Sequence, residues 1–174
     1  MDIRSLLRGI FAPVSNREFA ILLVFSIVYG AVFVNYIEYY IFSTALINAS
    51  VPPAYHIWLE IFYMVPFLTL VLFRKPLSIV LVYVLGRIAS LANDFAYPIY
   101  AKYVFHDYDG SLIEWWVWLF GFGPEEKFSW IVKMGFVEYQ MTSTIMAINL
   151  VIRLIIIAGF LLGYFYTKQM NESS

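Results

Sequence analysis

Long uninterrupted apolar segments constrain this chain more than any other feature of its sequence. About 18 to 20 consecutive apolar residues form a helix long enough to cross the hydrocarbon core of a bilayer, whereas shorter runs also fit soluble domains. The 174 residues hold four such runs and leave room for a single membrane domain. The expected spans cover about residues 19–46, 54–73, 77–105 and 141–167. We therefore predict an all-α fold, a polytopic bundle of about four transmembrane helices.

The composition agrees with a membrane protein and excludes several other classes. Hydrophobic residues make up 62% of the chain and charged residues 13%, whereas soluble domains have about 45–50% and about 25%. The 12 acidic and 11 basic residues leave a net charge of −1. This balance argues against nucleic-acid binding, because phosphates are neutralised by an excess of basic residues. The sequence contains no cysteine, so disulfides, thiolate metal sites and cysteine nucleophiles are excluded.

Local signals indicate where the spans begin and end. The polar residues 15–18 suit a helix start at a membrane surface. Two prolines, Pro52 and Pro53, predict a turn after the first span, and the basic residues before Pro76 predict a second turn. Residues 1–14 are expected to form a short interfacial helix.

The distribution of basic residues predicts the orientation of the bundle. One side holds Arg4, Arg8, Arg17, Arg74, Lys75 and Lys168, and the other holds Lys102, Lys127 and Lys133. Lys and Arg are retained on the cytoplasmic side of membranes, so both termini are expected to be cytoplasmic. The first apolar run is too long for a cleaved signal peptide. The sequence predicts an integral membrane protein and does not distinguish the plasma membrane from the endoplasmic reticulum.

The longest connection, between the third and fourth spans, contains a tryptophan-rich run. Residues 112–120 would be about 14 Å long as a helix, too short to cross a core of about 30 Å. We predict an interfacial helix whose tryptophans form an aromatic belt at headgroup depth, with a lid over a ligand site as the alternative. Residues 128–140 are expected either to extend the fourth span outward or to form a second interfacial helix.

Every predicted span carries polar or ionisable residues, although a charged group in hydrocarbon costs about 2.5–3.5 kcal/mol or more. At about 1.5 Å per residue, acidic and amide side chains from all four spans fall at similar heights, toward the far side of the membrane. Antiparallel helices can turn such side chains toward a common interior. We therefore predict a polar, acidic pocket for a hydrophobic small molecule or lipid. The candidate ligand-binding residues are Glu38, His56, Glu60, Asp94, Asn149 and Arg153, with Glu60 and Asp94 as candidate catalytic groups.

Other interpretations of these residues remain open. Glu60 or Asp94 could pair with Arg87 or Arg153 only to hold the bundle together, or the polar layer could conduct protons or ions. The chain could also be an accessory subunit of a larger complex or a homo-oligomer, because helices that are apolar all round need lipid or protein cover. With only two histidines and no nucleotide-binding glycine motif, we expect no metal and no cofactor. These residues leave open whether the chain is an enzyme.

Several short motifs resemble those of the emopamil-binding protein and sigma-2 receptor superfamily. Residues 52–67, in which Glu60 precedes a membrane proline, are similar to the family's second span. Residues 75–77, the pair Asn93-Asp94 and residues 146–149 continue the resemblance, which covers about residues 30–165.

The resemblance implies a helical bundle around a lipid-exposed cavity, in which acidic groups bind a cationic amine or stabilise a carbocation during sterol double-bond isomerisation. It implies Glu60 as the principal acidic group, Glu38 as the acid of the first span and Asn149 as a polar contact. Arg87 and Arg153 depart from the family pattern, and Arg153 could neutralise the carboxylate on which isomerisation depends.

Overall fold

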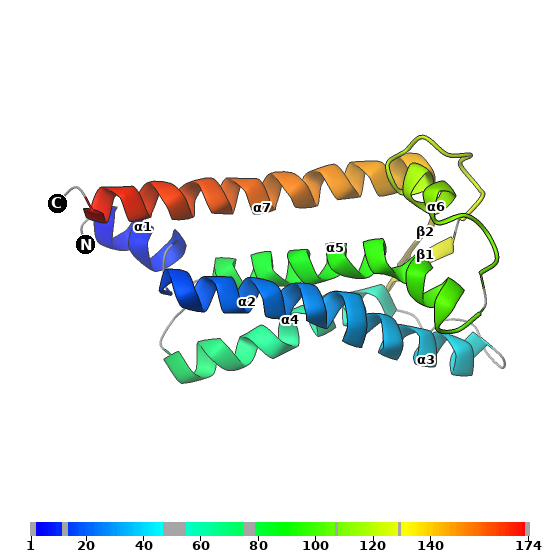
Figure 1. Ribbon diagram of the computed structural model, residues 1–174, viewed down its shortest axis with the longest axis horizontal. Coiled ribbons are helices and arrows are strands. Elements are labelled where there is room, and N and C mark those ends of the chain that lie inside the picture. The colour runs from blue at the N-terminus through cyan, green and yellow to red at the C-terminus, as the bar shows by residue number, and fades with distance from the viewer. Residues whose placement is uncertain are drawn as a thin grey trace.

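A computed structural model shows a mostly helical molecule in which successive long helical segments run in opposite directions (Figure 1). It describes residues 3–11, 14–46, 55–74, 79–106, 108–128 and 130–172. The elements are α1 (Ile3–Phe11), α2 (Asn16–Val28), the π-helix η1 (Tyr29–Val34), α3 (Asn35–Leu46), α4 (Tyr55–Arg74), α5 (Ile79–Tyr103), α6 (Leu112–Leu119), β1 (Trp130–Met134), β2 (Val137–Met141) and α7 (Ser143–Glu172).

The helices coincide with the predicted spans to within a few residues. Within the described part of the chain, three segments are long and apolar enough to cross a membrane: Gly9–Tyr40, Ile79–Tyr103 and Ser143–Met170. The helix α4 matches the remaining predicted span in position and has 20 residues. The helical fold class is therefore confirmed, with one two-stranded hairpin added to it.

The predicted start of the first long helix is confirmed at the level of hydrogen bonds. Ser15 and Glu18 form a capping box: the Glu18 amide donates to Ser15 Oγ at 3.3 Å, and the Ser15 amide donates to Glu18 Oε2 at 2.9 Å. The predicted N-terminal helix is present as α1, and Phe11 packs against Phe160 of α7. The turns predicted at Pro52, Pro53 and Pro76 lie outside the described residues.

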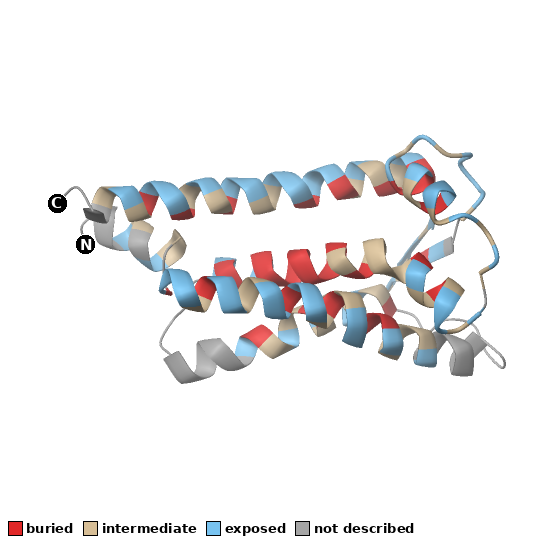
Figure 2. Cartoon of the chain, in the orientation of Figure 1, coloured by how far each residue is buried: buried red, intermediate tan, exposed pale blue. Residues whose placement is uncertain are grey.

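The helix α5 is the centre of the bundle and contacts α2, η1, α3, α4 and α7. Figure 2 shows that α5 carries a nearly continuous buried surface, whereas α7 is exposed along most of its length. Small residues of α5 permit close packing, and a Cβ added at Gly30 of η1 would collide with the backbone carbonyl of Ala89.

The π-helix η1 interrupts the first long helix in its middle. The Asn35 side chain, just after η1, donates from Nδ2 to the carbonyls of Gly30 at 3.4 Å and Ala31 at 3.0 Å. The same amide reaches the carbonyl of Asn93 on α5 at 3.2 Å. Asn35 therefore compensates the irregular backbone and ties it to the central helix. Such π-helical turns occur frequently at functional sites.

The end of the bundle opposite the termini is covered by α6 and the hairpin (Figure 1). The predicted helix over residues 112–120 is confirmed as α6. The prediction of an aromatic belt is wrong for two tryptophans, because Trp118 is 0% and Trp115 is 9% exposed. Their indole N–H groups donate to backbone carbonyls, and that of Trp115 reaches Asp94 of α5. These tryptophans pack inside the protein.

Residues 128–140 form neither of the two predicted helical structures. Strands β1 and β2 pair antiparallel from Trp130↔Met141 to Met134↔Val137, and α7 begins only at Ser143. The alternation of apolar and polar residues in β2 and the left-handed backbone of Gly135, with φ 67°, favour a hairpin. The helical predictions were wrong because the hydrophobicity of the segment as a whole hides this period of two.

Candidate functional site

Two consecutive residues of α5 direct polar side chains toward different neighbours. Successive helical residues are about 100° apart around the axis, so Asn93 and Asp94 project from different faces. Asn93 meets α3 and α4, whereas Asp94 meets α7. Asn93 and Asp94 therefore belong to two different, adjoining polar clusters.

The first cluster surrounds Glu38 of α3. Asn93 Nδ2 donates to Glu38 Oε2 at 2.8 Å and also lies 2.8 Å from the Tyr63 hydroxyl. The hydroxyl of Tyr55 donates to Glu38 Oε1 at 3.3 Å. Among the described residues, no Lys or Arg forms an ion pair with Glu38. Within the described part of the chain, the carboxylate is therefore held by neutral donors.

Two amide oxygens in this cluster add further acceptor capacity. The side chains of Asn35 and Asn93 are 1% and 3% exposed, and their Oδ1 atoms have no hydrogen-bond partner within the described part of the chain. A buried acceptor without a donor costs about 1–3 kcal/mol. The cluster would therefore gain stability from any group that brings hydrogen-bond donors.

The second cluster is an ion pair with supporting hydrogen bonds. Arg153 of α7 donates from Nη1 to Asp94 Oδ2 at 2.5 Å and to Ser90 Oγ at 2.8 Å. Its Nε atom donates to Asn149 Oδ1 at 2.5 Å. The side chains of Arg153 and Asp94 are 8% and 19% exposed. This network joins α5 to α7 and compensates both charges.

A second arginine compensates Glu60. The Glu60 carboxylate of α4 forms an ion pair with Arg87 of α5, whose guanidinium lies 5.1 Å from the Tyr83 ring centroid. The structural pairing that the sequence left open is thus present for Glu60 as well as for Asp94. Of the three predicted acidic residues, Glu38 is the one without an arginine among the described residues.

Among the described residues, His56 hydrogen-bonds to the hairpin and not to the carboxylates of either cluster. Its Nδ1 atom accepts a hydrogen bond from the backbone amide of Lys133 at 3.0 Å, and its ring lies edge-on to Tyr55. His56 therefore attaches the hairpin to the first turn of α4. Across the described ranges, no group of three His, Cys, Asp or Glu residues is placed to hold a metal ion.

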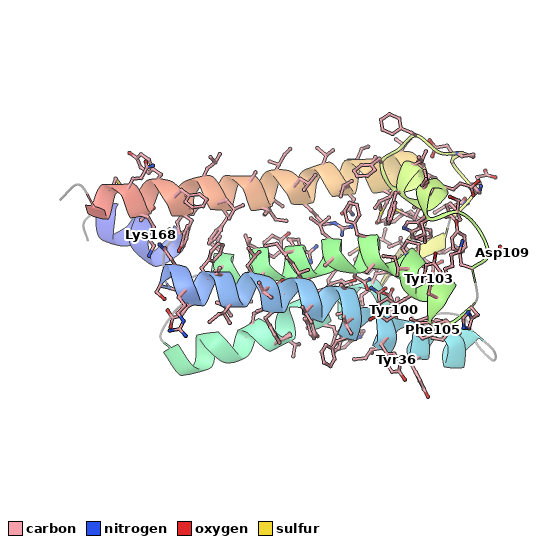
Figure 3. All side chains as sticks on the ribbon, in the orientation of Figure 1. Tyr36, Tyr100, Tyr103, Phe105, Asp109 and Lys168 are labelled. Atoms are coloured by element: carbon pink, nitrogen blue, oxygen red, sulfur yellow. The ribbon has the colours of Figure 1, made fainter. Side chains whose placement is uncertain are left out.

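Aromatic side chains gather around the first turn of α3 and the end of α5, next to the Glu38 cluster. Figure 3 shows Tyr36, Tyr100, Tyr103 and Phe105 together at this end, far from Lys168. The Tyr39 and Phe105 rings stack with centroids 3.4 Å apart. Tyr103, the last residue of α5, is exposed. Exposed tyrosines at a helix end are typical of a membrane–water interface.

Part of the site was not predicted from the sequence. The contact residues Tyr55, Ser90 and Asn93 were not in the predicted set, although Ser90 and Asn93 share the central helix with Asp94. Tyr55 gives no sequence signal of its own, because the chain contains 14 tyrosines. Asn149 and Arg153, which were in the predicted set, are four residues apart on one face of α7, where Arg153 Nε donates to Asn149 Oδ1.

Comparisons of the chain with protein-family models, with curated proteins and with solved structures find no match. The function is therefore inferred from the chemistry of the two clusters. A carboxylate surrounded by neutral donors can bind a positive charge, whereas the arginine-paired carboxylates mainly join helices.

Proposed function

We propose that this is a multi-pass membrane protein whose Glu38 cluster binds a hydrophobic ligand carrying a positive charge. The observation that supports it is the difference among the three acidic residues: Asp94 and Glu60 each pair with an arginine, whereas Glu38 accepts hydrogen bonds from Asn93 and Tyr55. Inside a bundle of low dielectric constant, such a carboxylate attracts a cation far more strongly than in water.

The surroundings of Glu38 indicate the form of this ligand. The amide oxygens of Asn35 and Asn93, which have no partner among the described residues, suit a ligand with hydrogen-bond donors on its charged group. The tyrosines suit cation–π contact. The apolar helices suit a lipid-like or sterol-like body that enters from the bilayer. The resemblance to the emopamil-binding protein and sigma-2 receptor superfamily favours the same ligand class, with isomerisation as its enzymatic form. We propose Glu38, and not Glu60, as the principal acidic group.

This function rests on a four-span arrangement with both termini cytoplasmic. At about 1.5 Å per residue, the 20 residues of α4 reach about 30 Å, the thickness of the hydrocarbon core. Lys168 and Asp109 lie at opposite ends of the molecule (Figure 3), and the basic residues near the termini favour the cytoplasm for the Lys168 end.

Cysteine labelling tests this orientation, since the natural chain has no cysteine. In intact cells, Asp109→Cys is expected to react with a membrane-impermeant thiol reagent, and Gln169→Cys only after the membrane is permeabilised. Both positions are exposed, so access alone decides the result. Labelling of Gln169→Cys from outside would reverse the orientation.

Replacement of Glu38 by glutamine tests the ligand site. This change keeps the side-chain volume but removes the charge, so binding of a lipophilic amine should weaken by about tenfold or more, as expected for loss of a charged hydrogen-bond partner. Binding and the melting temperature would be measured in detergent for wild type, Glu38→Gln and Glu60→Gln.

Glu60→Gln is the matched control, because Arg87 already compensates that carboxylate. It should retain amine binding. Failure of the wild type to bind lipophilic amines, or equal affinity in wild type and Glu38→Gln, would contradict the proposed site.

An accessory subunit of a larger complex is the second candidate, and the exposed surface of α7 favours it. In the most apolar 18-residue stretch of α7, only 22% of the residues are buried within the molecule. The outer face of the helix is therefore left to lipid or to another protein. Native mass spectrometry of the purified protein distinguishes the two functions. A retained lipid-sized mass supports the ligand site, and a stoichiometric protein partner supports the subunit.

A further inference from the structure

The turn of the hairpin presents an apolar surface that is largely exposed and does not pack into the core. Here the hairpin tip means residues 134–137. Phe136 is 99% exposed, and its neighbours Met134 and Val137 are 38% and 47% exposed. Farther back on the same hairpin, Val132 and Met141 are buried against the protein. The hairpin thus extends beyond the core on which it packs and ends in apolar side chains.

Turn chemistry does not explain the aromatic residue at this position. In a two-residue hairpin turn whose first residue is Gly, the second residue can be of any type, so the turn itself does not require an aromatic side chain. Gly135 supplies the positive φ here, whereas Phe136 contributes a large apolar side chain that is in contact with almost nothing. In water this exposure would be unfavourable, so the side chain suits an apolar environment.

The contact between the hairpin and α4 indicates the depth of the tip. The Lys133 amide is hydrogen-bonded to His56. The middle of α4 lies between Met64 and Val65, so His56 is about 13 Å from it along the helix axis. The hydrocarbon core extends about 15 Å from its midplane. If α4 spans the membrane as proposed above, Lys133 and the adjoining tip lie at the edge of the hydrocarbon.

The charges beside the tip fit the same depth. Lys133 and Glu138 pair across the two strands directly behind the tip, with Lys133 Nζ and Glu138 Oε1 3.6 Å apart. An apolar tip followed by a pair of charged side chains matches the change from acyl chains to headgroups at a bilayer surface.

We propose that the hairpin tip inserts into the bilayer interface beside α4, with Phe136 among the acyl chains and Lys133 and Glu138 at the headgroups. The occupant of this apolar surface is therefore lipid of the same membrane that α4 crosses. The hairpin then acts as an anchor that holds the first turn of α4, including His56 and the neighbouring Tyr55, at a fixed depth.

A fluorescent label that reports its environment tests this contact. The full-length variant Phe136→Cys would be labelled with such a dye and reconstituted in phosphatidylcholine vesicles. We expect blue-shifted emission and loss of most of the intensity when the vesicles contain lipids spin-labelled near the headgroup. The same dye at Asp109→Cys, in an exposed polar loop, should keep its water-like emission.

A third label, at the exposed Trp58 of α4, separates this proposal from the proposed span. Quenching at Trp58→Cys without quenching at Phe136→Cys would overturn the insertion of the tip and leave the span intact. If neither position is quenched, α4 does not lie in lipid, and both proposals fail. Blue-shifted emission at Phe136→Cys that spin-labelled lipid does not quench would indicate a protein contact, which also overturns insertion. Amine binding by Glu38 is tested independently of these labels.

Discussion

Replacement of Asp94 by alanine is expected to lower the free energy of unfolding by about 3–5 kcal/mol, as is typical when one partner of a buried ion pair is removed. The variant would leave the Arg153 guanidinium, only 8% exposed, with hydrogen bonds to Ser90 and Asn149 but without its negative charge. The loss should also loosen the contact between α5 and α7. Chemical or thermal unfolding of the variant and of the wild type in detergent measures this loss of stability.

An exposed ion pair of the same protein provides the control. Glu114 and Lys127 pair at 2.8 Å, with side chains 50% and 41% exposed. Exposed pairs contribute about 0–1 kcal/mol, so Glu114→Ala should cost little. The double replacement of Asp94 by leucine and Arg153 by methionine should cost less than Asp94→Ala, because no charge stays buried alone. Equal stability of Asp94→Ala and wild type would show that the pair does not hold the bundle together.

The lengths of the apolar runs predicted the long helices well, because a helix that crosses a membrane has to stay apolar over the thickness of the hydrocarbon core. The start of α2 was predictable from Ser15 and Glu18, whose capping box depends on residues three apart. The π-helix η1 was not predictable in this way. It depends on contacts of Gly30 and Asn35 with α5, residues more than 50 positions away in sequence.

The sequence indicated several of the polar residues that the candidate site contains, but not which carboxylate pairs with which arginine. Heights along the spans predicted acidic and amide residues in one layer, and the structure shows contacts among some of these residues, such as Asn93 with Glu38 and Asp94 with Arg153. Height alone does not say which face of a helix meets which neighbour. The structure pairs Glu60 with Arg87 and Asp94 with Arg153, and so leaves Glu38 as the carboxylate among neutral donors. The rotation of each helix about its axis decides this outcome.

The loop between α5 and α7 shows a different limit. A short run rich in tryptophan suits both a membrane interface and a protein interior, because the indole ring is apolar with one donor. The carbonyls of Asp94 and Glu125 accept hydrogen bonds from Trp115 and Trp118. These acceptors are on other segments, so the sequence around the tryptophans could not distinguish a belt from a packed cap.

Replacement of Gly30 by alanine is expected to destabilise the protein by about 3 kcal/mol, at the upper end of the range for an overpacked core. The added Cβ would overlap the carbonyl oxygen, carbonyl carbon and Cα of Ala89. All three are backbone atoms, so no side-chain rotation can relieve the overlap, and η1 would have to move away from α5. That movement would also stretch the hydrogen bond from Asn35 to the Asn93 carbonyl. The unfolding midpoint in detergent measures the cost.

Gly159 is the matched control, because it lies on the exposed face of α7 and an added Cβ there meets nothing within 4 Å. Alanine suits a helix better than glycine by about 0.5–1 kcal/mol, so Gly159→Ala should be neutral or slightly stabilising. Because η1 leads directly into Asn35 and α3, displacement of η1 should also shift Glu38 relative to Asn93, and Gly30→Ala should weaken amine binding while Gly159→Ala does not. Equal stability of the two alanine variants would show that η1 and α5 do not pack at the distance seen here.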